Sequence, residues 1–224
     1  MQKLTLHAPI VQVAIDTLNI DDALRIAEAA VKAGVDWLEI GTPLVTFAGT
    51  AAIGAIARAF PGVPVLADYK MMDGVRKYVV ETERQGGKIC TICAVSSDSS
   101  IREAVRASNE TGVLLISDLY AAPDIPLRAE QLEAMGVDSV YVHWGADQRN
   151  ENPSRDPLSD LPGVIERVKI PVGVGTFSVE DGVRAFQMGA KIAVIGVPLI
   201  LEADIEGALR KYVELSKSAY RGDK

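Results

Sequence analysis

The sequence predicts a single (β/α)8 barrel, and three observations support that prediction. Short runs of β-branched and other apolar residues alternate with longer stretches of helical spacing along the chain. Most of these runs are continuously apolar, which is typical of parallel strands buried on both faces. The length of 224 residues is near the ~250 residues of a one-domain barrel. We therefore expect one domain over residues 1–224, with an open doubly wound sheet as the alternative.

The apolar runs give eight strand candidates. They are Ile10–Asp16, Val35–Ile40, Val63–Tyr69, Lys88–Cys93, Val113–Asp118, Val137–His143, Ile170–Val174 and Ala190–Ile195. Glycine separates a helical stretch from the next strand at Gly34, Gly136 and Gly189, as expected where a helix ends in a left-handed residue. Strands that alternate with helices in this way predict a parallel sheet with right-handed crossovers.

Composition and charge exclude several classes of function. The net charge of −7 argues against a nucleic-acid partner. No apolar run reaches the ~18 residues of a membrane span, and the first residues lack the order of a signal peptide. Cys90 and Cys93 lie in one predicted strand with their side chains on opposite faces. We therefore expect two buried, reduced thiols and a cytoplasmic location, not a redox pair.

Titratable residues stand at the C-terminal ends of several predicted strands. They are Asp16, Glu39, Asp68, Asp118 and His143. A charge inside a barrel costs free energy unless it is paired or used, and this fold carries its active sites at that end. For Asp16, catalysis and capping of the first helix both remain open. For His143, the alternative to a proton-transfer role is a core histidine with satisfied hydrogen bonds.

A cation site is expected between the second and third strands. Glu39 and Asp68 would approach each other there, and two close carboxylates repel unless a cation lies between them. Mg²⁺ favours oxygen ligands and keeps water or substrate oxygens as well. Lys70 could face the same way as Asp68 and stabilise an enediolate, the anion formed beside a ketone. Structural ion pairs among Glu39, Asp68, Lys70 and Asp73 are the alternative.

Several segments resemble one known family. Asp68-Tyr69-Lys70-Met71-Met72-Asp73 matches the DxKxxD signature of the orotidine 5′-monophosphate decarboxylase superfamily. Within that superfamily, the chain resembles the group of 3-hexulose-6-phosphate synthases and 3-keto-L-gulonate-6-phosphate decarboxylases. The segments that carry this resemblance are Gln12–Asp16, Glu39–Pro43, Thr91–Ile101 and the HxGxD of His143–Asp147. The resemblance covers nearly the whole chain, and the HxGxD segment fits the synthases better.

This resemblance implies a Mg²⁺-dependent carbon–carbon lyase that acts on a phosphorylated ketose. Glu39 and Asp68 would hold the metal, Lys70 would steady the enediolate and His143 would move protons. Asp73 would reach across a homodimer interface into the partner's site. The synthase reaction joins formaldehyde to ribulose 5-phosphate, and decarboxylation is the alternative chemistry. An isomerase or epimerase, and a barrel that binds without catalysis, also remain open.

The phosphate site is where the sequence departs from the family's pattern. The family grips phosphate with the loops after strands seven and eight, the second of which carries Gly-Arg. Here Val197 stands at the arginine position, and Pro198 lacks a backbone donor. The resemblance assigns phosphate binding to the backbone of Gly173, Gly175, Thr176 and Gly196, although these residues could simply form turns.

Two arginines could replace the missing guanidinium. Arg149 and Arg155 lie in the polar segment Trp144–Pro157, which follows the sixth strand and is expected on the active face. We assign Arg149 to the substrate site, with a solvated loop charge as the alternative. The sequence thus predicts the family's metal and enediolate chemistry with a changed grip on the substrate.

Overall fold

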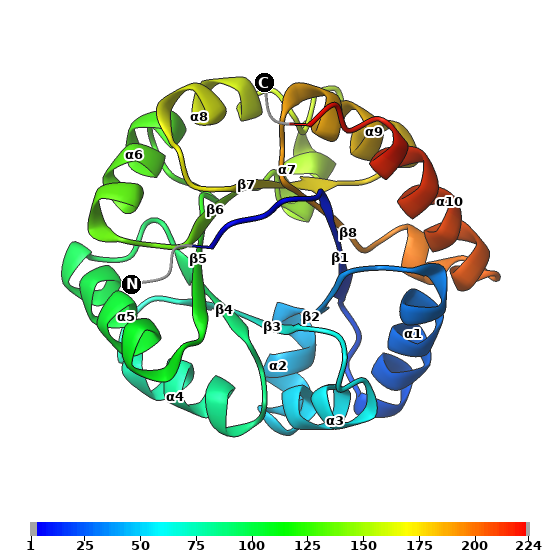
Figure 1. The fold of residues 1–224 in the computed structure, drawn as a ribbon, viewed down its shortest axis with the longest axis horizontal. Helices are drawn as coiled ribbons and strands as arrows, with labels where there is room; N and C mark the ends of the chain where they lie inside the picture. Colours follow the sequence, from blue (N-terminus) through cyan, green and yellow to red (C-terminus); the bar gives the residue numbers. More distant parts are fainter. Residues whose placement is uncertain (1–3, 223–224) are drawn as a thin grey trace.

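A closed barrel of parallel strands forms the centre of the protein. The computed structural model describes residues 4–222, so the outermost residues of the predicted domain 1–224 lie outside it. The strands are β1 (Ile10–Ile15), β2 (Trp37–Ile40), β3 (Val65–Met71), β4 (Ile89–Cys93), β5 (Leu114–Asp118), β6 (Ser139–Val142), β7 (Val172–Thr176) and β8 (Ile192–Ile195). They pair in sequence order, and β1 also pairs with β8 (Figure 1). This closure confirms the predicted fold and excludes the open sheet.

Helices surround the barrel on all sides (Figure 1). They are α1 (Ile20–Ala33), α2 (Thr42–Ala48), α3 (Ala51–Ala59), α4 (Arg76–Arg84), α5 (Asp98–Thr111), α6 (Ile125–Met135), α7 (Ala146–Glu151), α8 (Leu161–Arg167), α9 (Val179–Met188), the 3₁₀ turn η1 (Leu199–Leu201) and α10 (Ile205–Ser218). The predicted glycine joints are confirmed: Gly34, Gly136 and Gly189 end α1, α6 and α9 at φ values of 88°, 98° and 103°. Glycine adopts this left-handed conformation without a Cβ clash.

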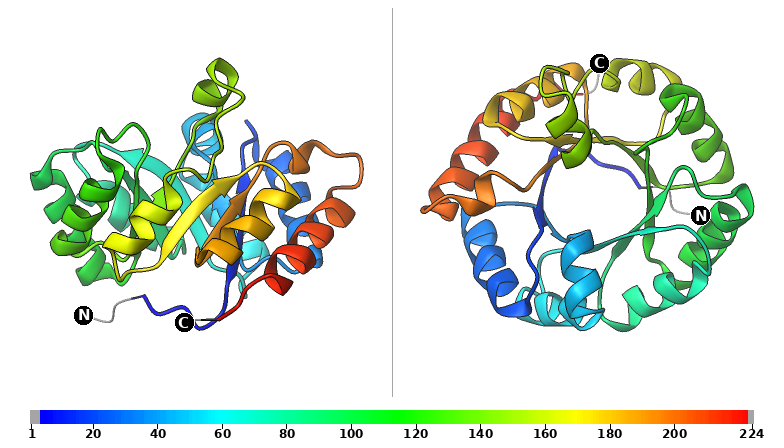
Figure 2. Two further views of the ribbon diagram at one scale, coloured as in Figure 1. Left: turned by 90° about the horizontal axis from the view of Figure 1, so that it is seen from above. Right: turned by 180° about the vertical axis from the view of Figure 1, so that it is seen from behind.

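Two apolar clusters make up the core. The larger one fills the space between the strands and the outer helices. The smaller one lies inside the barrel and consists of Trp37, Leu66, Ile89, Ile116, Tyr141 and Ile192. Leu4 and Leu6 pack against it from the chain segment that precedes β1. Figure 2 shows this segment crossing one end of the barrel, while α7 projects from the other end.

Strand ends differ from the predicted bounds where the chain enters the candidate site. The third strand continues past Tyr69 to Met71, and its pairing with β4 shifts between Ala67 and Met71. This irregularity brings Lys70 to a φ of 48°, which is unusual for a residue with a Cβ. His143 lies one residue beyond β6, and the segment Trp144–Pro157 contains the short helix α7.

The cysteine prediction is confirmed. Cys90 and Cys93 are both buried and free of disulfides. Burial raises the pKa of Cys90 to about 12 and that of Cys93 to about 11, so both thiols stay protonated at neutral pH. Within residues 4–222, no single helix is long and apolar enough to span a membrane. Helices α2 and α3 reach that length and composition only when taken together, and a bend of 112° separates them.

Candidate active site

A cavity of about 600 Å³ opens at the C-terminal ends of the strands. Its volume is in the range of small-molecule sites in proteins. The sequence-predicted residues that line it are Asp16, Glu39, Asp68, Lys70, His143, Gly175, Thr176 and Gly196. Eight predicted residues from six strands and their following loops are therefore brought together, as the barrel prediction requires.

Asp68 is held by three side chains from neighbouring elements. Its Oδ1 accepts a hydrogen bond from Thr91 Oγ1 at 2.7 Å, and its Oδ2 accepts one from Thr42 Oγ1 at 2.7 Å. Lys70 Nζ donates to the same Oδ2. Thr91 Oγ1 also accepts the backbone N–H of Lys70 at 3.0 Å. One threonine hydroxyl thus fixes both the Asp68 carboxylate and the irregular backbone that presents Lys70.

Lys70 lies between two buried carboxylates. Its Nζ contacts Asp68 and lies 3.2 Å from Asp118 Oδ2. Burial alone would lower the pKa of Lys70, but the negative charges of Asp68, Asp118 and Glu39 raise it above its usual value. The side chain is therefore a permanent ammonium at neutral pH, suited to stabilising an anion and not to acting as a base.

His143 shares Asp118 with Lys70. Its Nδ1 lies 2.8 Å from Asp118 Oδ2, while Asp118 Oδ1 accepts the backbone N–H of Tyr120 at 3.0 Å. Burial lowers the pKa of His143, but the Asp118 charge and hydrogen bond outweigh burial and raise it above 6.5. Burial opposes ionisation of Asp118, yet His143 and Lys70 hold the pKa of Asp118 at about 2. With Nδ1 engaged, Nε2 is the nitrogen left for a substrate.

Asp16 follows β1 at the wall of the same cavity. Its carboxylate lies over Gly41, where a Cβ would come within 2.0 Å of Asp16 Oδ1, so only glycine fits at the end of β2. Burial and the nearby Asp68 charge raise the pKa of Asp16. The first helix is capped by the side chain of Asn19. Capping of α1 therefore does not account for Asp16.

Glu39 is the most enclosed acid of the group. Its Oε2 accepts a hydrogen bond from Gln12 Nε2 at 2.5 Å, and Gln12 Oε1 in turn accepts one from Tyr141 Oη at 2.7 Å. Burial raises the pKa of Glu39 well above its ordinary value, and the charges of Asp68 and Asp16 raise it further. An unbalanced buried carboxylate of this kind is stabilised by an added positive charge.

The donor set of the cavity fits a hard divalent cation. Five acids line the cavity: Asp16, Glu39, Asp68, Asp118 and Asp147. Of the described residues that line it, Lys70 is the only lysine or arginine. Within residues 4–222 no three His, Cys, Asp or Glu side chains are already arranged as a metal cluster. Mg²⁺ needs no such cluster, because it is commonly held by one or two carboxylates plus water and substrate oxygens.

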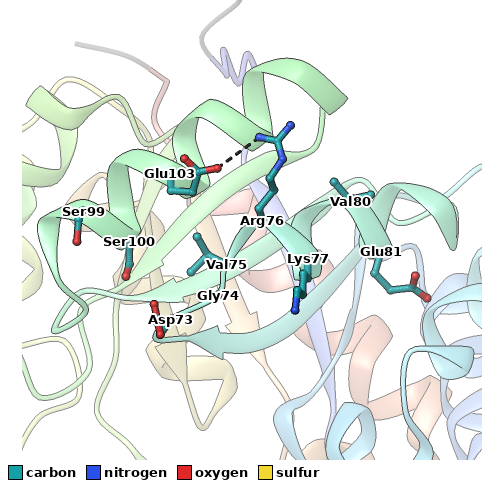
Figure 3. Close-up of a pocket in the computed structure, with 10 residues that line it drawn as sticks. All are labelled: Asp73, Gly74, Val75, Arg76, Lys77, Val80, Glu81, Ser99, Ser100 and Glu103. Carbon is teal, nitrogen blue, oxygen red and sulfur yellow. Dashed lines mark hydrogen bonds and ion pairs between the residues drawn. The ribbon is translucent and has the colours of Figure 1, made fainter.

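Three predicted residues lie outside this cavity. Asp73 is exposed and lines a separate cavity of about 660 Å³ between α4 and α5, together with residues such as Arg76 and Glu103 (Figure 3). Gly173 pairs with Tyr141 and Ile192 inside the sheet, below the mouth of the barrel. Arg149 stacks on Phe177 with 4.3 Å between its guanidinium carbon and the ring centroid, and Phe177 itself lines the cavity.

Other residues that shape the site were not assigned from the sequence. Asp118 was recognised as a charge at a strand end but was given no role. Its contacts with Lys70 and His143 are long-range and became visible only in the fold. No role was assigned from the sequence to Thr42, Thr91, Gln12 or Tyr141, because uncharged polar residues of these types also occur at surface and core positions without a function.

The Asp118–His143 contact predicts a measurable pKa change. We expect the pKa of His143 to lie above 6.5 in the wild type and to fall in Asp118→Asn, because the charge and hydrogen bond of Asp118, which outweigh burial, are then lost. The His143 contribution to stability is complete below about pH 6.5 and is lost as pH rises through its folded-state pKa, whereas the Asp118 contribution is complete above about pH 4 and is lost as pH falls toward 2. The pair therefore stabilises the fold most between about pH 4 and pH 6.5. NMR titration in the presence of a chelator can follow both of the two histidines. His7→Gln assigns the signals, and an unchanged His143 pKa in Asp118→Asn would contradict the assignment.

Comparisons with known proteins identify the family of this chain. The Orotidine 5′-phosphate decarboxylase / HUMPS family matches residues 9–212. The 3-hexulose-6-phosphate synthase 2 of Staphylococcus saprophyticus is 38% identical over 165 residues, 73% of this chain and 77% of the relative. The 3-hexulose-6-phosphate synthase of Staphylococcus aureus is 36% identical over 165 residues, with 73% and 78% covered.

Solved structures show the same relationship. A 3-hexulose-6-phosphate synthase structure is 31% identical, with a TM-score of 0.86 over 94% of this chain and 99% of the other. The synthase from Salmonella typhimurium is 29% identical, with a TM-score of 0.88 over 94% and 100%. The chain therefore belongs to the orotidine 5′-phosphate decarboxylase / HUMPS family and is an enzyme of the lyase class.

Proposed function

We propose that this chain is a cytoplasmic 3-hexulose-6-phosphate synthase that joins formaldehyde to ribulose 5-phosphate. The observation that carries the proposal is the continuous chain Asp68–Lys70–Asp118–His143 along one wall of the cavity. It combines a permanent cation with a proton-transfer group beside it, which is what an enediolate and a new alkoxide require. The similarity to proteins named 3-hexulose-6-phosphate synthase supports this choice.

The side chains divide the reaction between them. Removal of a proton from C1 of the ketose gives the enediolate, whose negative charge the Lys70 ammonium offsets. C1 then forms a bond to the formaldehyde carbon, and the carbonyl oxygen becomes an alkoxide that takes a proton. His143 Nε2 and the Asp16 carboxylate, whose pKa values are both raised, are the groups we assign to these proton transfers. A Mg²⁺ ion held by Glu39 and Asp68 would stabilise negative charge on the sugar oxygens.

The substrate phosphate is assigned to the opposite side of the cavity. Gly175, Thr176 and Gly196 offer backbone groups there, but the nearby helix start is already occupied: Asp181 Oδ2 accepts the N–H of Phe177 at 3.0 Å. The first turn of α9 also carries two acids, which repel an anion. These features favour a side-chain cation as the main phosphate ligand. Arg149 is suitable because its guanidinium lies against Phe177 and has no carboxylate partner within residues 4–222.

We also propose a homodimer in which Asp73 serves the partner's site. Asp73 faces the separate cavity of Figure 3, so it cannot complete the site of its own chain. Large apolar side chains are exposed on the surrounding segments, at Met72, Tyr78, Val80 and Val95. Exposed apolar residues gathered on adjoining segments are typical of interaction surfaces.

The proposed reaction predicts formaldehyde-dependent consumption of ribulose 5-phosphate in the presence of Mg²⁺. Lys70→Ala should lower kcat about 10²- to 10³-fold, because it removes the cation that stabilises the enediolate. Lys88→Ala, an exposed lysine at the start of β4, should have no effect. Chromatography of the six-carbon product and loss of formaldehyde provide the measurement.

The same assay separates the alternatives. Release of CO₂ from 3-keto-L-gulonate 6-phosphate, with no use of formaldehyde, would instead indicate a decarboxylase. An isomerase or epimerase would change the sugar without changing its carbon count. If the wild type fails to exchange the C1 proton of the ketose in deuterium oxide, enediolate chemistry is excluded and the barrel only binds its ligand.

Arg149→Ala tests the phosphate assignment. A charge-assisted hydrogen bond of about 1.5–3 kcal/mol predicts a KM for ribulose 5-phosphate that rises about 10- to 100-fold. We expect kcat to stay nearly constant, since the phosphate is bound equally in the ground and transition states. Arg167→Ala removes an exposed arginine on α8 and serves as the control. An unchanged KM in Arg149→Ala would leave phosphate binding to the backbone groups.

Mixing two inactive variants tests the dimer. If each site combines Lys70 of one protomer with Asp73 of the other, Lys70→Ala and Asp73→Asn chains together rebuild one intact site in every mixed dimer. Free exchange of equal amounts should then restore about a quarter of the wild-type activity. Sedimentation velocity confirms the assembly, and Val80→Lys should dissociate it. A fully active monomer, or a mixture that regains no activity, would overturn the shared site.

A further inference from the structure

A line of buried hydrogen bonds crosses the barrel beneath the active-site cavity. It runs from Tyr141 on β6 to Gln12 on β1 and then to Glu39 on β2. All three residues are buried, and Gln12 has no exposed surface. Tyr141 and Gln12 are 129 positions apart in the chain, so the contact depends on closure of the barrel. Below this line the interior of the barrel is apolar.

The direction of each hydrogen bond follows from its neighbour. Burial and the nearby Glu39 charge raise the pKa of Tyr141 well above 10, so its hydroxyl remains a donor. That donor occupies Gln12 Oε1 and turns the Gln12 amide nitrogen toward Glu39. A flipped amide would bring its carbonyl oxygen against the carboxylate of Glu39 and leave two acceptors facing each other. The Tyr141 hydroxyl therefore selects the orientation of the amide.

Glu39 is consequently held by one oxygen only. Its Oε2 accepts from Gln12, whereas its Oε1 has no hydrogen-bond partner among the described residues. Glu39 itself lines the active-site cavity. The carboxylate thus combines a fixed oxygen with one that is available to a ligand in the cavity.

Gly173 makes this arrangement possible. A Cβ at position 173 would lie 2.5 Å from two ring carbons of Tyr141, closer than side chains tolerate. The surroundings of Gly173 therefore suggest a packing role instead of the predicted role in phosphate binding. Its missing side chain provides the space in which the Tyr141 ring crosses the barrel toward Gln12.

We propose that Tyr141 and Gln12 are positioning residues that orient the Glu39 carboxylate for a divalent cation, with Gly173 making room for the Tyr141 ring. This inference rests on the proposed function, because it takes Glu39 to be a cation ligand. Hydrogen bonds that orient a ligand carboxylate generally contribute tenfold to a hundredfold to metal affinity.

The test is a titration with Mn²⁺ in the absence of substrate, in which electron paramagnetic resonance measures the free ion. Tyr141→Phe removes the hydroxyl and keeps the ring, and should weaken the Mn²⁺ Kd by roughly 10- to 100-fold. Tyr212→Phe is the matched control: Tyr212, like Tyr141, is buried, and it hydrogen-bonds Thr176 Oγ1 at 2.7 Å and lies against Gly182. It should bind Mn²⁺ as the wild type does, although it loses an equally buried hydroxyl.

Two further variants separate the possible failures. Glu39→Gln should abolish Mn²⁺ binding, and if it binds normally the cation site of the proposed function is wrong. If Glu39→Gln loses binding while Tyr141→Phe binds like the wild type, the positioning inference alone is overturned. Gly173→Ala displaces the ring and should weaken binding as Tyr141→Phe does, which keeps the inference testable if one variant misfolds. Thermal unfolding of each variant identifies misfolding independently of the metal.

Discussion

The placement of the Lys70 ammonium between Asp68 and Asp118 is the interaction on which the rest of the site depends. Without this cation, several carboxylates would meet at the mouth of the barrel in a partly water-excluded space, and their mutual repulsion would oppose folding. The contact is obtained at the cost of an unusual backbone, since Lys70 adopts a φ of 48°. Thr91 accepts the N–H of that backbone and bonds Asp68, so the strain and the ion pair are supported by one hydroxyl.

Polarity is arranged in levels along the barrel axis. Leu4, Leu6 and the aliphatic side chains of the inner apolar cluster (Leu66, Ile89, Ile116 and Ile192) fill the end opposite the cavity. Gln12 and Tyr141 form the next level, where the Tyr141 hydroxyl donates to Gln12 and Gln12 donates to Glu39. The titratable side chains follow only above that level, at the strand ends. The charged side chains thus lie where water and substrate can reach them, and the hydrogen bond from Gln12 lies directly below Glu39.

The fold was predictable because its signals are local. Parallel strands buried on both faces read as apolar runs, and Gly34, Gly136 and Gly189 mark helix ends through a conformation that other residues avoid. Much of the site was predictable for a related reason: a barrel brings its strand ends together, so titratable residues at several ends must be neighbours. What the sequence did not reveal are contacts that depend on which side chain faces which across the barrel.

Gly173 is an example of a residue whose contact could not be predicted from the sequence. The family resemblance assigned Gly173 to phosphate binding, whereas its neighbour in space is the ring of Tyr141, contributed by the adjacent strand. A single glycine gives no sign of the partner that fills its space. Asp118 shows the converse: its location at a strand end was evident, but its contacts with Lys70 and His143 could be recognised only from the positions of those two side chains. Roles that arise from pairs of residues far apart in the chain need coordinates.

The two sides of the cavity have different physical demands. The reacting side needs interactions that strengthen as charge develops, so its groups are fixed by strands and by hydrogen bonds to neighbouring strands. The side to which we assign the substrate phosphate would need only binding that is equal before and during the reaction, and segments that connect the strands to the helices can supply that. Arg149 on the projecting helix α7, Phe177 after β7 and Val197 after β8 lie in such connecting segments. Under the proposed function, a different mode of phosphate binding is thus compatible with the observed geometry of Lys70, Asp118 and His143.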